Sequence, residues 1–341
     1  MPPNPPGRRP LARRRVLGLG GGLLLGALAG CTDPRVVPEP GLSPPVSTLP
    51  AETAPATPTP PRTAEAAAAE QAAAVLAAAL LADRRVELSR SARRLVTAAR
   101  DAHRDHAVVL AHPEPTTRPT TAPSAGTTPM PARLPRTVTV RALADTERAL
   151  ARRHAAAVPA SRGLTALLWG SLSVAATTMA GALSARGPVP VAPARDRRAM
   201  PVVVADVAGV QALVSQLHAA VYGYQVAIGR LAPGSERRER AVAGLAERRA
   251  LRDRLTTFLI ARQADVPVAA AAYVPSVRVT GPASAAALIA AVETALLPYA
   301  GQWLASATAR REVEAAFAEL GRTAGLARRW GGPVVRWPGW P

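Results

Sequence analysis

Residues 207–231, VAGVQALVSQLHAAVYGYQVAIGRL, decide the fold class of this chain. Apolar side chains recur there at alternating steps of three and four, at Val207, Val210, Val214, Leu217, Val221, Tyr224, Ile228 and Leu231. This period places one apolar stripe on a helix and favours knobs-into-holes packing against neighbouring helices. The stretch therefore predicts one helix of a helical bundle.

Three more helices are predicted downstream. The sequence APGSE, residues 232–236, ends the first helix at Gly234 and provides Ser235 as the N-cap of the next helix. Apolar stripes then mark three further helices, at about 245–259, 288–303 and 313–324, and the connection between the first two of these is the longest. This order predicts a four-helix bundle with a crossover over residues 207–341.

The N-terminal half also carries helical signals. No glycine or proline occurs from Ala64 to His112, and a turn is expected at Ala82–Arg85. Two more helices are expected at about 138–158 and 161–185, with Pro159 at the corner between them. The chain is therefore predicted to be all-α, because alanine-rich helices pack closely without large aromatic side chains.

Proline marks the borders of the predicted domains. We expect a helical bundle at 64–185 with a Pro/Thr-rich loop at 113–136, and a linker at 186–206 before the C-terminal bundle. A Pro-rich stretch at 31–63 is predicted to be a disordered tether, since proline removes backbone donors and favours extended chain.

The first 30 residues resemble an export signal. Arginines precede an apolar run that is shorter than the roughly 20 residues of a membrane-spanning helix. The run Arg13–Leu17 resembles a twin-arginine signal, and Leu28–Cys31 resembles a bacterial lipobox. We therefore predict a signal peptide at 1–30 and lipid attachment at Cys31, which would hold the protein at the outer face of the cytoplasmic membrane. The alternative is an uncleaved signal anchor.

The chain is strongly basic, with a formal net charge of +19, and all 42 of its basic residues are arginine. Nucleic acid is not the expected partner, because the leader directs export and no motif combines aromatic and basic residues. Anionic lipid or a cell-wall polymer is the available partner for such charge. The alternative is an ordinary solvated arginine surface.

Two motifs carry a family resemblance. The stretch His218–Tyr224 (HAAVYGY) and the tail 329–339 (RWGGPVVRWPG) resemble a ferritin-like domain of unknown function in actinobacterial lipoproteins. The resemblance implies a ferritin-like bundle at 207–341 and supplies no known reaction. The acid that the family carries before the histidine falls on Leu217, and a family histidine falls near Arg248.

Few metal-ligand positions of that family remain here. His218 and Glu293 match the pattern, as do Tyr222 and Tyr299. No Glu-x-x-His sequence occurs in the chain, which argues against a di-iron centre. We therefore interpret Leu217 as a core residue and Glu293 as a hydrogen-bond partner of His218 across the bundle.

The N-terminal half offers a rival cluster. His103 and His106 share one stripe of a predicted helix, and Glu147 and His154 share a stripe of another. If these helices face each other, two to four ligands converge, which is enough for Zn²⁺. The alternative is that His103 and His106 lie at a helix end and face solvent.

No catalytic motif is evident. The sequence has no phosphate loop, no G-x-S-x-G elbow and no Cys-x-x-Cys pair. We therefore predict a lipid-anchored, non-enzymatic structural or interaction protein of the cell envelope, with an unknown protein partner and no cofactor. The alternatives are a metal-binding ferritin-like protein and a basic module for anionic lipid or wall polymer.

Overall fold

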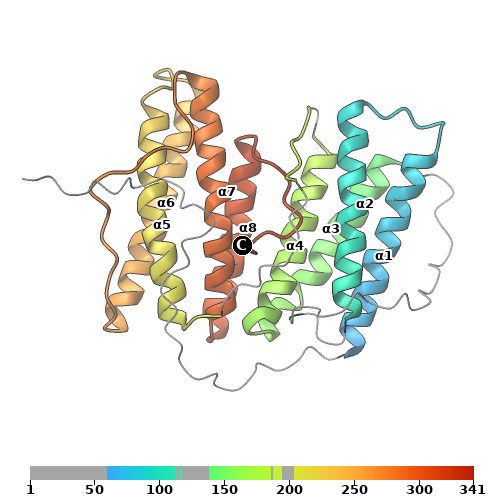
Figure 1. Cartoon of the computed structure of the whole chain (residues 1–341), viewed down its shortest axis with the longest axis horizontal. Coiled ribbons are helices and arrows are strands. Elements are labelled where there is room, and N and C mark those ends of the chain that lie inside the picture. Colours follow the sequence, from blue (N-terminus) through green and yellow to red (C-terminus); the bar gives the residue numbers. More distant parts are fainter. Residues whose placement is uncertain (1–59, 113–115, 117–137, 186, 194–202) are drawn as a thin grey trace, which may run out of the picture. The chain divides into compact units, whose positions relative to one another are not determined.

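The structure is a computed structural model that describes residues 60–112, 116, 138–185, 187–193 and 203–341. Within these residues the regular structure is helical, so the all-α prediction is confirmed (Figure 1). The elements are α1 (Pro60–Ala82), α2 (Arg90–Ala111), α3 (Val140–Ala155), the 3₁₀ helix η1 (Val158–Ala160), α4 (Gly163–Leu183), α5 (Asp206–Ile228), α6 (Glu236–Ala261), α7 (Pro282–Ser306) and α8 (Arg310–Arg329).

The first four helices form two antiparallel pairs. Helix α1 packs along α2 and α3 packs along α4, while α1 also contacts α3 and α2 contacts α4. The break expected at Ala82–Arg85 is present, because α1 ends at Ala82. Polar N-cap residues begin α2 and α3. Ser89 Oγ accepts a hydrogen bond from the amide of Ala92 at the start of α2, and Thr139 Oγ1 accepts one from the amide of Ala142 at the start of α3.

The last four helices form the bundle that the heptad pattern predicts. Helix α5 packs against both α6 and α7, and α7 packs against α8. Leu217 is fully buried, which confirms its interpretation as a core residue. Ser235 caps α6 by accepting a hydrogen bond from the amide of Arg238, and Gly234 before it has a φ of +71° that favours glycine. The ferritin-like expectation is consistent with this arrangement.

Helix α4 joins the two halves. It has no distinct polar face, as expected of a largely buried helix, and it packs against α3, α7 and α8, while Thr177 and Gly181 near its C-terminal end are exposed. Gly170 permits close approach, because a Cβ atom there would lie 2.6 Å from a Leu304 methyl group. One hydrophobic core therefore runs from Leu167 and Leu172 on α4 to Val210 and Leu304 in the C-terminal half.

Among the described helices, three are long and apolar enough to cross a membrane by length and composition alone. They are Arg62–Ala82 in α1, Gly163–Leu183 (α4) and Pro282–Ser306 (α7). In the structure, 83% of the most apolar window of α4 is buried inside the protein. Its apolar surface therefore packs against other helices here.

Several sequence predictions fall outside the described residues. The signal peptide at 1–30, the lipid attachment site Cys31 and residues 31–59 of the tether lie there, as do most of the loop at 113–136 and part of the linker at 186–206. These predictions stay predictions. Residues 60–63, expected in the tether, are instead the first residues of α1.

Candidate metal centre

Helix α1 contributes one acid to the interior of the N-terminal half. Glu70 is the single charged residue between Ala66 and Ala82, and its side chain is almost completely buried. A buried carboxylate is tolerated only with hydrogen bonds or a positive partner. The groups that face Glu70 therefore define the site.

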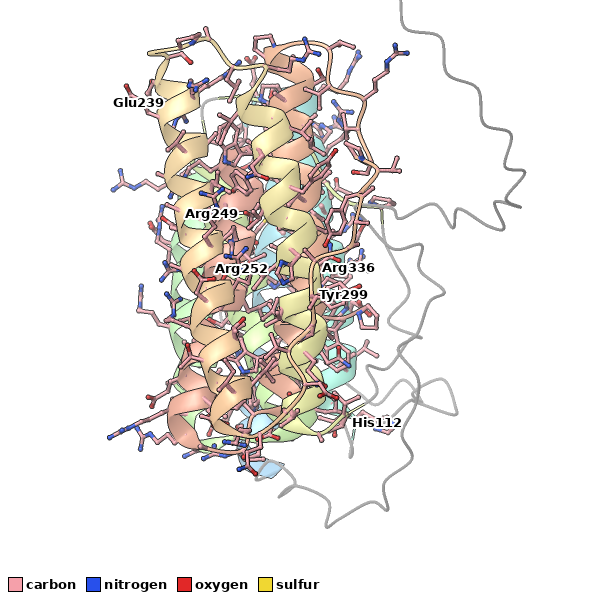
Figure 2. All side chains as sticks on the ribbon, turned by 90° about the vertical axis from the view of Figure 1, so that its left-hand side faces the viewer. His112, Glu239, Arg249, Arg252, Tyr299 and Arg336 are labelled. Atoms are coloured by element: carbon pink, nitrogen blue, oxygen red, sulfur yellow. The ribbon has the colours of Figure 1, made fainter. Side chains whose placement is uncertain are left out.

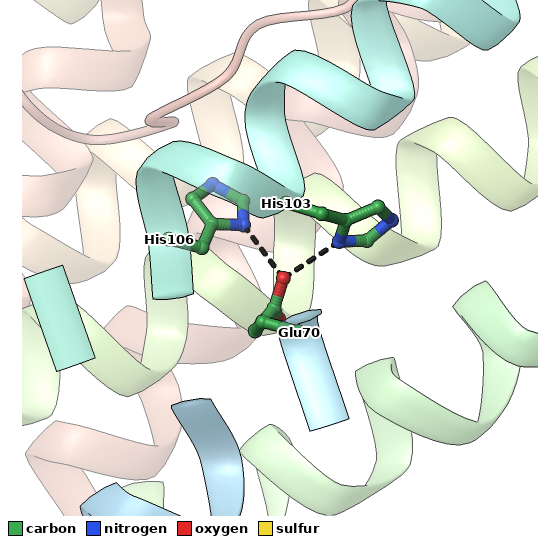
Figure 3. Close-up of side chains that lie close together, drawn as sticks. All are labelled: Glu70, His103 and His106. Atoms are coloured by element: carbon green, nitrogen blue, oxygen red, sulfur yellow. Dashed lines mark hydrogen bonds and ion pairs between the residues drawn. The ribbon is translucent and has the colours of Figure 1, made fainter. Parts of the chain in front are cut away.

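Two histidines of α2 face this carboxylate. His103 and His106 are three residues apart, so they project from the same side of the helix, and both are buried. The Nδ1 atom of His103 lies 2.6 Å from Glu70 Oε2, and the Nδ1 atom of His106 lies 3.1 Å from the same oxygen (Figure 3). One ligand atom from each residue lies within 4.8 Å of the other two.

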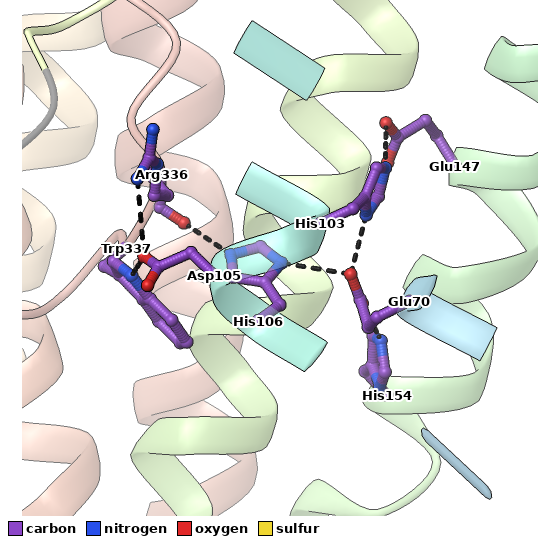
Figure 4. A network of polar contacts seen from close by, with 8 residues as sticks. All are labelled: Glu70, His103, Asp105, His106, Glu147, His154, Arg336 and Trp337. Atoms are coloured by element: carbon purple, nitrogen blue, oxygen red, sulfur yellow. Dashed lines mark hydrogen bonds and ion pairs between the residues drawn. The ribbon is translucent and has the colours of Figure 1, made fainter. Parts of the chain in front are cut away.

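The second nitrogen of each ring faces another acceptor. His103 Nε2 lies 2.9 Å from Glu147 Oε1 on α3, and His106 Nε2 lies 3.1 Å from the backbone carbonyl oxygen of Arg336 (Figure 4). His154 on α3 approaches Glu70 from the other side, with Nε2 at 2.7 Å from Oε1. In His103 and His106, each of the two ring nitrogens therefore faces a hydrogen-bond acceptor.

This arrangement needs positive charge. While the facing carboxylates are ionised, a ring between two acceptors must either carry protons on both nitrogens or have a cation between one nitrogen and its acceptor. Burial lowers the pKa of His103, but the carboxylates of Glu147 and Glu70 outweigh it and raise the pKa to about 10. Burial raises the pKa of Glu70, yet His106 and His103 together hold it well below its usual range.

Two polar atoms of the cluster lack a hydrogen-bond partner among the described residues. They are Glu147 Oε2 and His154 Nδ1, and both are buried. A small cavity of about 30 Å³ lies beside the cluster and is lined by His103, His106 and Glu147, among others. A cavity of this size has room for about two water molecules.

The donor set matches a transition-metal ion. Imidazole nitrogen and carboxylate oxygen suit Zn²⁺ and related ions, whereas Ca²⁺ and Mg²⁺ take oxygen ligands. Ligand atoms of a tetrahedral zinc site lie about 3.3 Å apart when each bond is about 2.0 Å long. The distances from Glu70 Oε2 to the two rings are 2.6 and 3.1 Å, which is shorter by about 0.7 and 0.2 Å. Small side-chain shifts would therefore admit an ion.

The C-terminal bundle has a different polar centre. Arg248 on α6 donates from Nε and Nη2 to the two oxygens of Glu293 on α7, at 2.9 and 2.7 Å, and also donates to Glu319 on α8. Tyr224 donates to Glu293 at 2.7 Å, and Thr323 donates to Glu319 at 3.0 Å. Burial lowers the pKa of Arg248, but its two carboxylate partners raise it, so the guanidinium stays charged.

This geometry corrects the predicted pairing of His218 with Glu293. The Nε2 atom of His218 lies 3.1 Å from the carbonyl oxygen of Pro267, in the loop after α6, whereas Glu293 is occupied by Arg248 and Tyr224. His218 is half-buried, and burial lowers its pKa. The prediction failed because His218 lies at the edge of the apolar stripe of α5 and turns toward the loop.

The rival cluster in the N-terminal half comes together. His103, His106, Glu147 and His154 all take part in the network around Glu70, so the solvent-facing alternative for His103 and His106 is wrong. Glu70 itself was missed. The available signal was a lone acid within an otherwise apolar, alanine-rich helix, because such a charge must have a partner if the helix is buried.

Residues 209–341 match the family model described as a domain of unknown function, DUF4439. The match includes Arg248, Glu293 and the tail with Arg336, whereas Glu70 and the histidines around it precede the matched residues. A crystal structure of a conserved hypothetical protein from Mycobacterium tuberculosis is 27% identical, over 37% of this chain and 93% of that chain, with a TM-score of 0.35. No curated protein matches the chain.

Proposed function

We propose that this protein binds a divalent transition-metal ion, with Zn²⁺ the best match, through Glu70, His103 and His106. One observation carries the proposal: the Nδ1 atoms of both histidines converge on one oxygen of Glu70, while both Nε2 atoms face acceptors. Histidines that bind metals usually donate their other N–H group to a carboxylate or a backbone carbonyl. Glu147 and the carbonyl of Arg336 fill these two roles.

His154 holds the other oxygen of Glu70 in this proposal and is a partner of that ligand. Its Nε2 atom lies 2.7 Å from Glu70 Oε1, and its ring stacks on Trp169 with a centroid distance of 5.7 Å. Glu70, His103 and His106 supply three protein ligands, and a water molecule in the fourth position would complete the tetrahedral site that zinc prefers. The expected role is binding rather than turnover, because the adjoining cavity of about 30 Å³ is far smaller than a substrate pocket of roughly 300 Å³ or more.

The decisive test is metal content. Full-length protein purified in detergent should carry, or take up, one Zn²⁺ per chain, measured by elemental analysis and by competition with a chromophoric chelator. Glu70→Gln and His103→Gln should lose most of this binding, because each removes a ligand while preserving side-chain volume. His218→Gln is the matched control and should bind as the wild type does.

Two results would contradict the proposal. One is a wild-type protein that binds none of Zn²⁺, Co²⁺, Mn²⁺ or Fe²⁺ under these conditions. The other is Zn²⁺ binding that survives both substitutions around Glu70 and is lost in His218→Gln, which would move the centre to the C-terminal bundle.

The proposed location is the cell envelope, with the chain anchored by lipid at Cys31. Its support is the sequence of the leader: arginines, a short apolar run and the lipobox-like residues Leu28–Cys31. Two or more acyl chains on one cysteine make a stable anchor. Cys31→Ser should therefore give unprocessed or released protein. Normal processing and membrane retention of this variant would refute lipid attachment at Cys31.

A second candidate function is contact with anionic lipid or wall polymer. Helix α6 is rich in arginine, and Figure 2 shows Arg249 and Arg252 along it, with Glu239 nearer one end. Exposed arginines of this helix include Arg237, Arg240, Arg249 and Arg254. Binding to anionic vesicles that disappears as salt is raised would support this function, whereas equal binding to neutral vesicles would contradict it.

A further inference from the structure

The C-terminal tail, residues 330–341, leaves α8 and lies against the N-terminal half. Val334 pairs in parallel with Val191: its amide donates to the carbonyl of Pro190, and its carbonyl accepts from the amide of Ala192, both at 2.9 Å. Farther along, Gly339 packs so closely on Gly301 of α7 that a Cβ atom at Gly301 would lie 2.0 Å from the Gly339 carbonyl oxygen. The tail is thus fixed on both sides of Arg336 and Trp337.

Between these two anchors the tail touches the metal cluster. The carbonyl oxygen of Arg336 lies 3.1 Å from His106 Nε2, and this carbonyl can only accept a hydrogen bond. Nε2 must therefore carry the ring proton, which leaves the Nδ1 atom of a neutral His106 with its lone pair directed toward Glu70 (Figure 4). The tail thereby selects the tautomer that a metal ligand needs.

A second contact holds that carbonyl in place. The indole Nε1 atom of Trp337 donates to Asp105 Oδ2 on α2 at 2.7 Å, and the guanidinium of Arg336 lies 3.5 Å from the same oxygen. The Trp337 ring also packs edge-on against the His106 ring, with centroids 4.5 Å apart. Asp105 immediately precedes His106, so this contact ties the tail to the backbone that carries the ligand.

We propose that the C-terminal tail is a positioning element of the metal site, in which Trp337 and Asp105 fix the Arg336 carbonyl and hence the orientation of His106. This inference rests on the proposed metal binding and deepens it. It assigns a role to part of the DUF4439-matching region, because residues from that region complete a site whose ligands all lie outside it. Metal affinity then depends on the docked tail as well as on the ligands.

The wall of the small cavity supports the same assignment. Val334, Val335 and Arg336 of the tail line it together with His103, His106 and Glu147. The tail therefore separates the cluster from solvent on this side, and loosening it would expose the ligands to water and competing chelators. An early effect of a weakened tail should be faster metal loss.

The test compares tail variants in the full-length protein. Trp337→Phe keeps an aromatic side chain, although a smaller one, and removes the indole N–H donor, whereas Asp105→Ala removes the acceptor. We expect each to lower Zn²⁺ affinity by about 10–100-fold, the range typical of groups that orient a metal ligand. Asp105→Asn keeps an acceptor oxygen and should restore most of the affinity. Trp303→Phe is the control, since Trp303 is buried on α7 in the C-terminal half.

Two further measurements separate positioning from general destabilisation. Thermal unfolding should show the metal-free Trp337→Phe and Trp303→Phe proteins to be similarly stable, and Co²⁺ absorption should change only in the tail variants. If the wild type binds Zn²⁺ and both Trp337→Phe and Asp105→Ala bind it equally tightly, the tail assignment is wrong while the proposed metal binding stands. A wild type that binds no metal would instead overturn the proposed function together with this inference.

Discussion

Both halves of the molecule bury negatively charged glutamates, and each compensates this charge with a different kind of cationic side chain. Each buries two glutamates at its polar centre, Glu70 and Glu147 in the first half and Glu293 and Glu319 in the second. In the second half the compensating charge is the guanidinium of Arg248, which is covalently part of the chain. In the first half the partners are imidazoles, which accept and release protons and bind metal ions.

This difference bears on the proposed metal binding, because it shows which half could take up an external cation. Arg248 is always charged and forms a two-point contact with Glu293, so no external cation is needed there. The imidazoles around Glu70 offer lone pairs once they lose a proton, so an ion can replace protons. The comparison is consistent with a structural centre in the C-terminal half and supports the proposal of a binding centre in the N-terminal half.

The largest effect is expected from removing the fixed cation. Arg248→Met leaves two buried glutamates without their partner and should lower the free energy of unfolding by about 3–5 kcal/mol. Arg249→Met, at the exposed neighbouring position, should change it by less than about 0.5 kcal/mol. Urea denaturation measures both. A loss below about 1 kcal/mol for Arg248→Met would show that the C-terminal centre does not depend on its arginine.

Zinc should act on the other centre only. At a free concentration 100 times the dissociation constant, Zn²⁺ should raise the free energy of unfolding by about 2.7 kcal/mol, because it binds the folded state. Glu70→Gln should abolish this gain, whereas Arg249→Met should retain it. A thermal shift of equal size in wild type and Glu70→Gln would break the comparison.

The metal-free protein should lose stability in mild alkali. The pKa of His103 is raised to about 10 in the folded state by Glu147 and Glu70, against about 6.5 when unfolded. The folded state therefore keeps a proton that the unfolded state has lost, so this stabilisation is full below pH 6.5 and disappears as pH rises through 10. The slope is about 1.4 kcal/mol per pH unit between these values.

Lysine side chains, which also titrate in alkali, do not complicate the measurement, because the chain contains no lysine. Unfolding would be followed at several pH values with a chelator present. His103→Gln should remove the slope, and Arg248 should contribute nothing because it stays charged throughout. An unchanged slope in His103→Gln would assign the pH dependence to other groups.

The smallest effect compares two buried hydroxyl groups. Thr323 donates to Glu319, so Thr323→Val should cost about 1 kcal/mol, the usual net value of one hydrogen bond. The Ser171 hydroxyl on α4 has no hydrogen-bond partner among the described residues, so Ser171→Ala should be close to neutral or slightly stabilising. Equal losses for both variants, measured by urea denaturation, would contradict this account.

The helices could be predicted from the sequence because their signals are local. The three-four repeat of α5, the cap at Ser235 and the turn after Ala82 each depend on residues a few positions apart. Packing of the two halves through α4 could not be predicted in this way. A helix without a distinct polar face is expected to be largely buried, and its sequence does not say against which partners.

By itself, the sequence determined the all-α class, the approximate positions of the helices and a set of candidate ligands at His103, His106, Glu147 and His154. Only the tertiary structure decided which of the candidates meet. The tertiary structure placed Glu70 beside these ligands, from an alanine-rich helix that has no distinct polar face. It also buried Arg248, while the neighbouring Arg249 stays exposed. It also carried the Arg336 carbonyl to His106, 230 residues away in sequence. Helices follow from short-range backbone preferences, whereas a site depends on long-range packing that places distant side chains within a few ångströms.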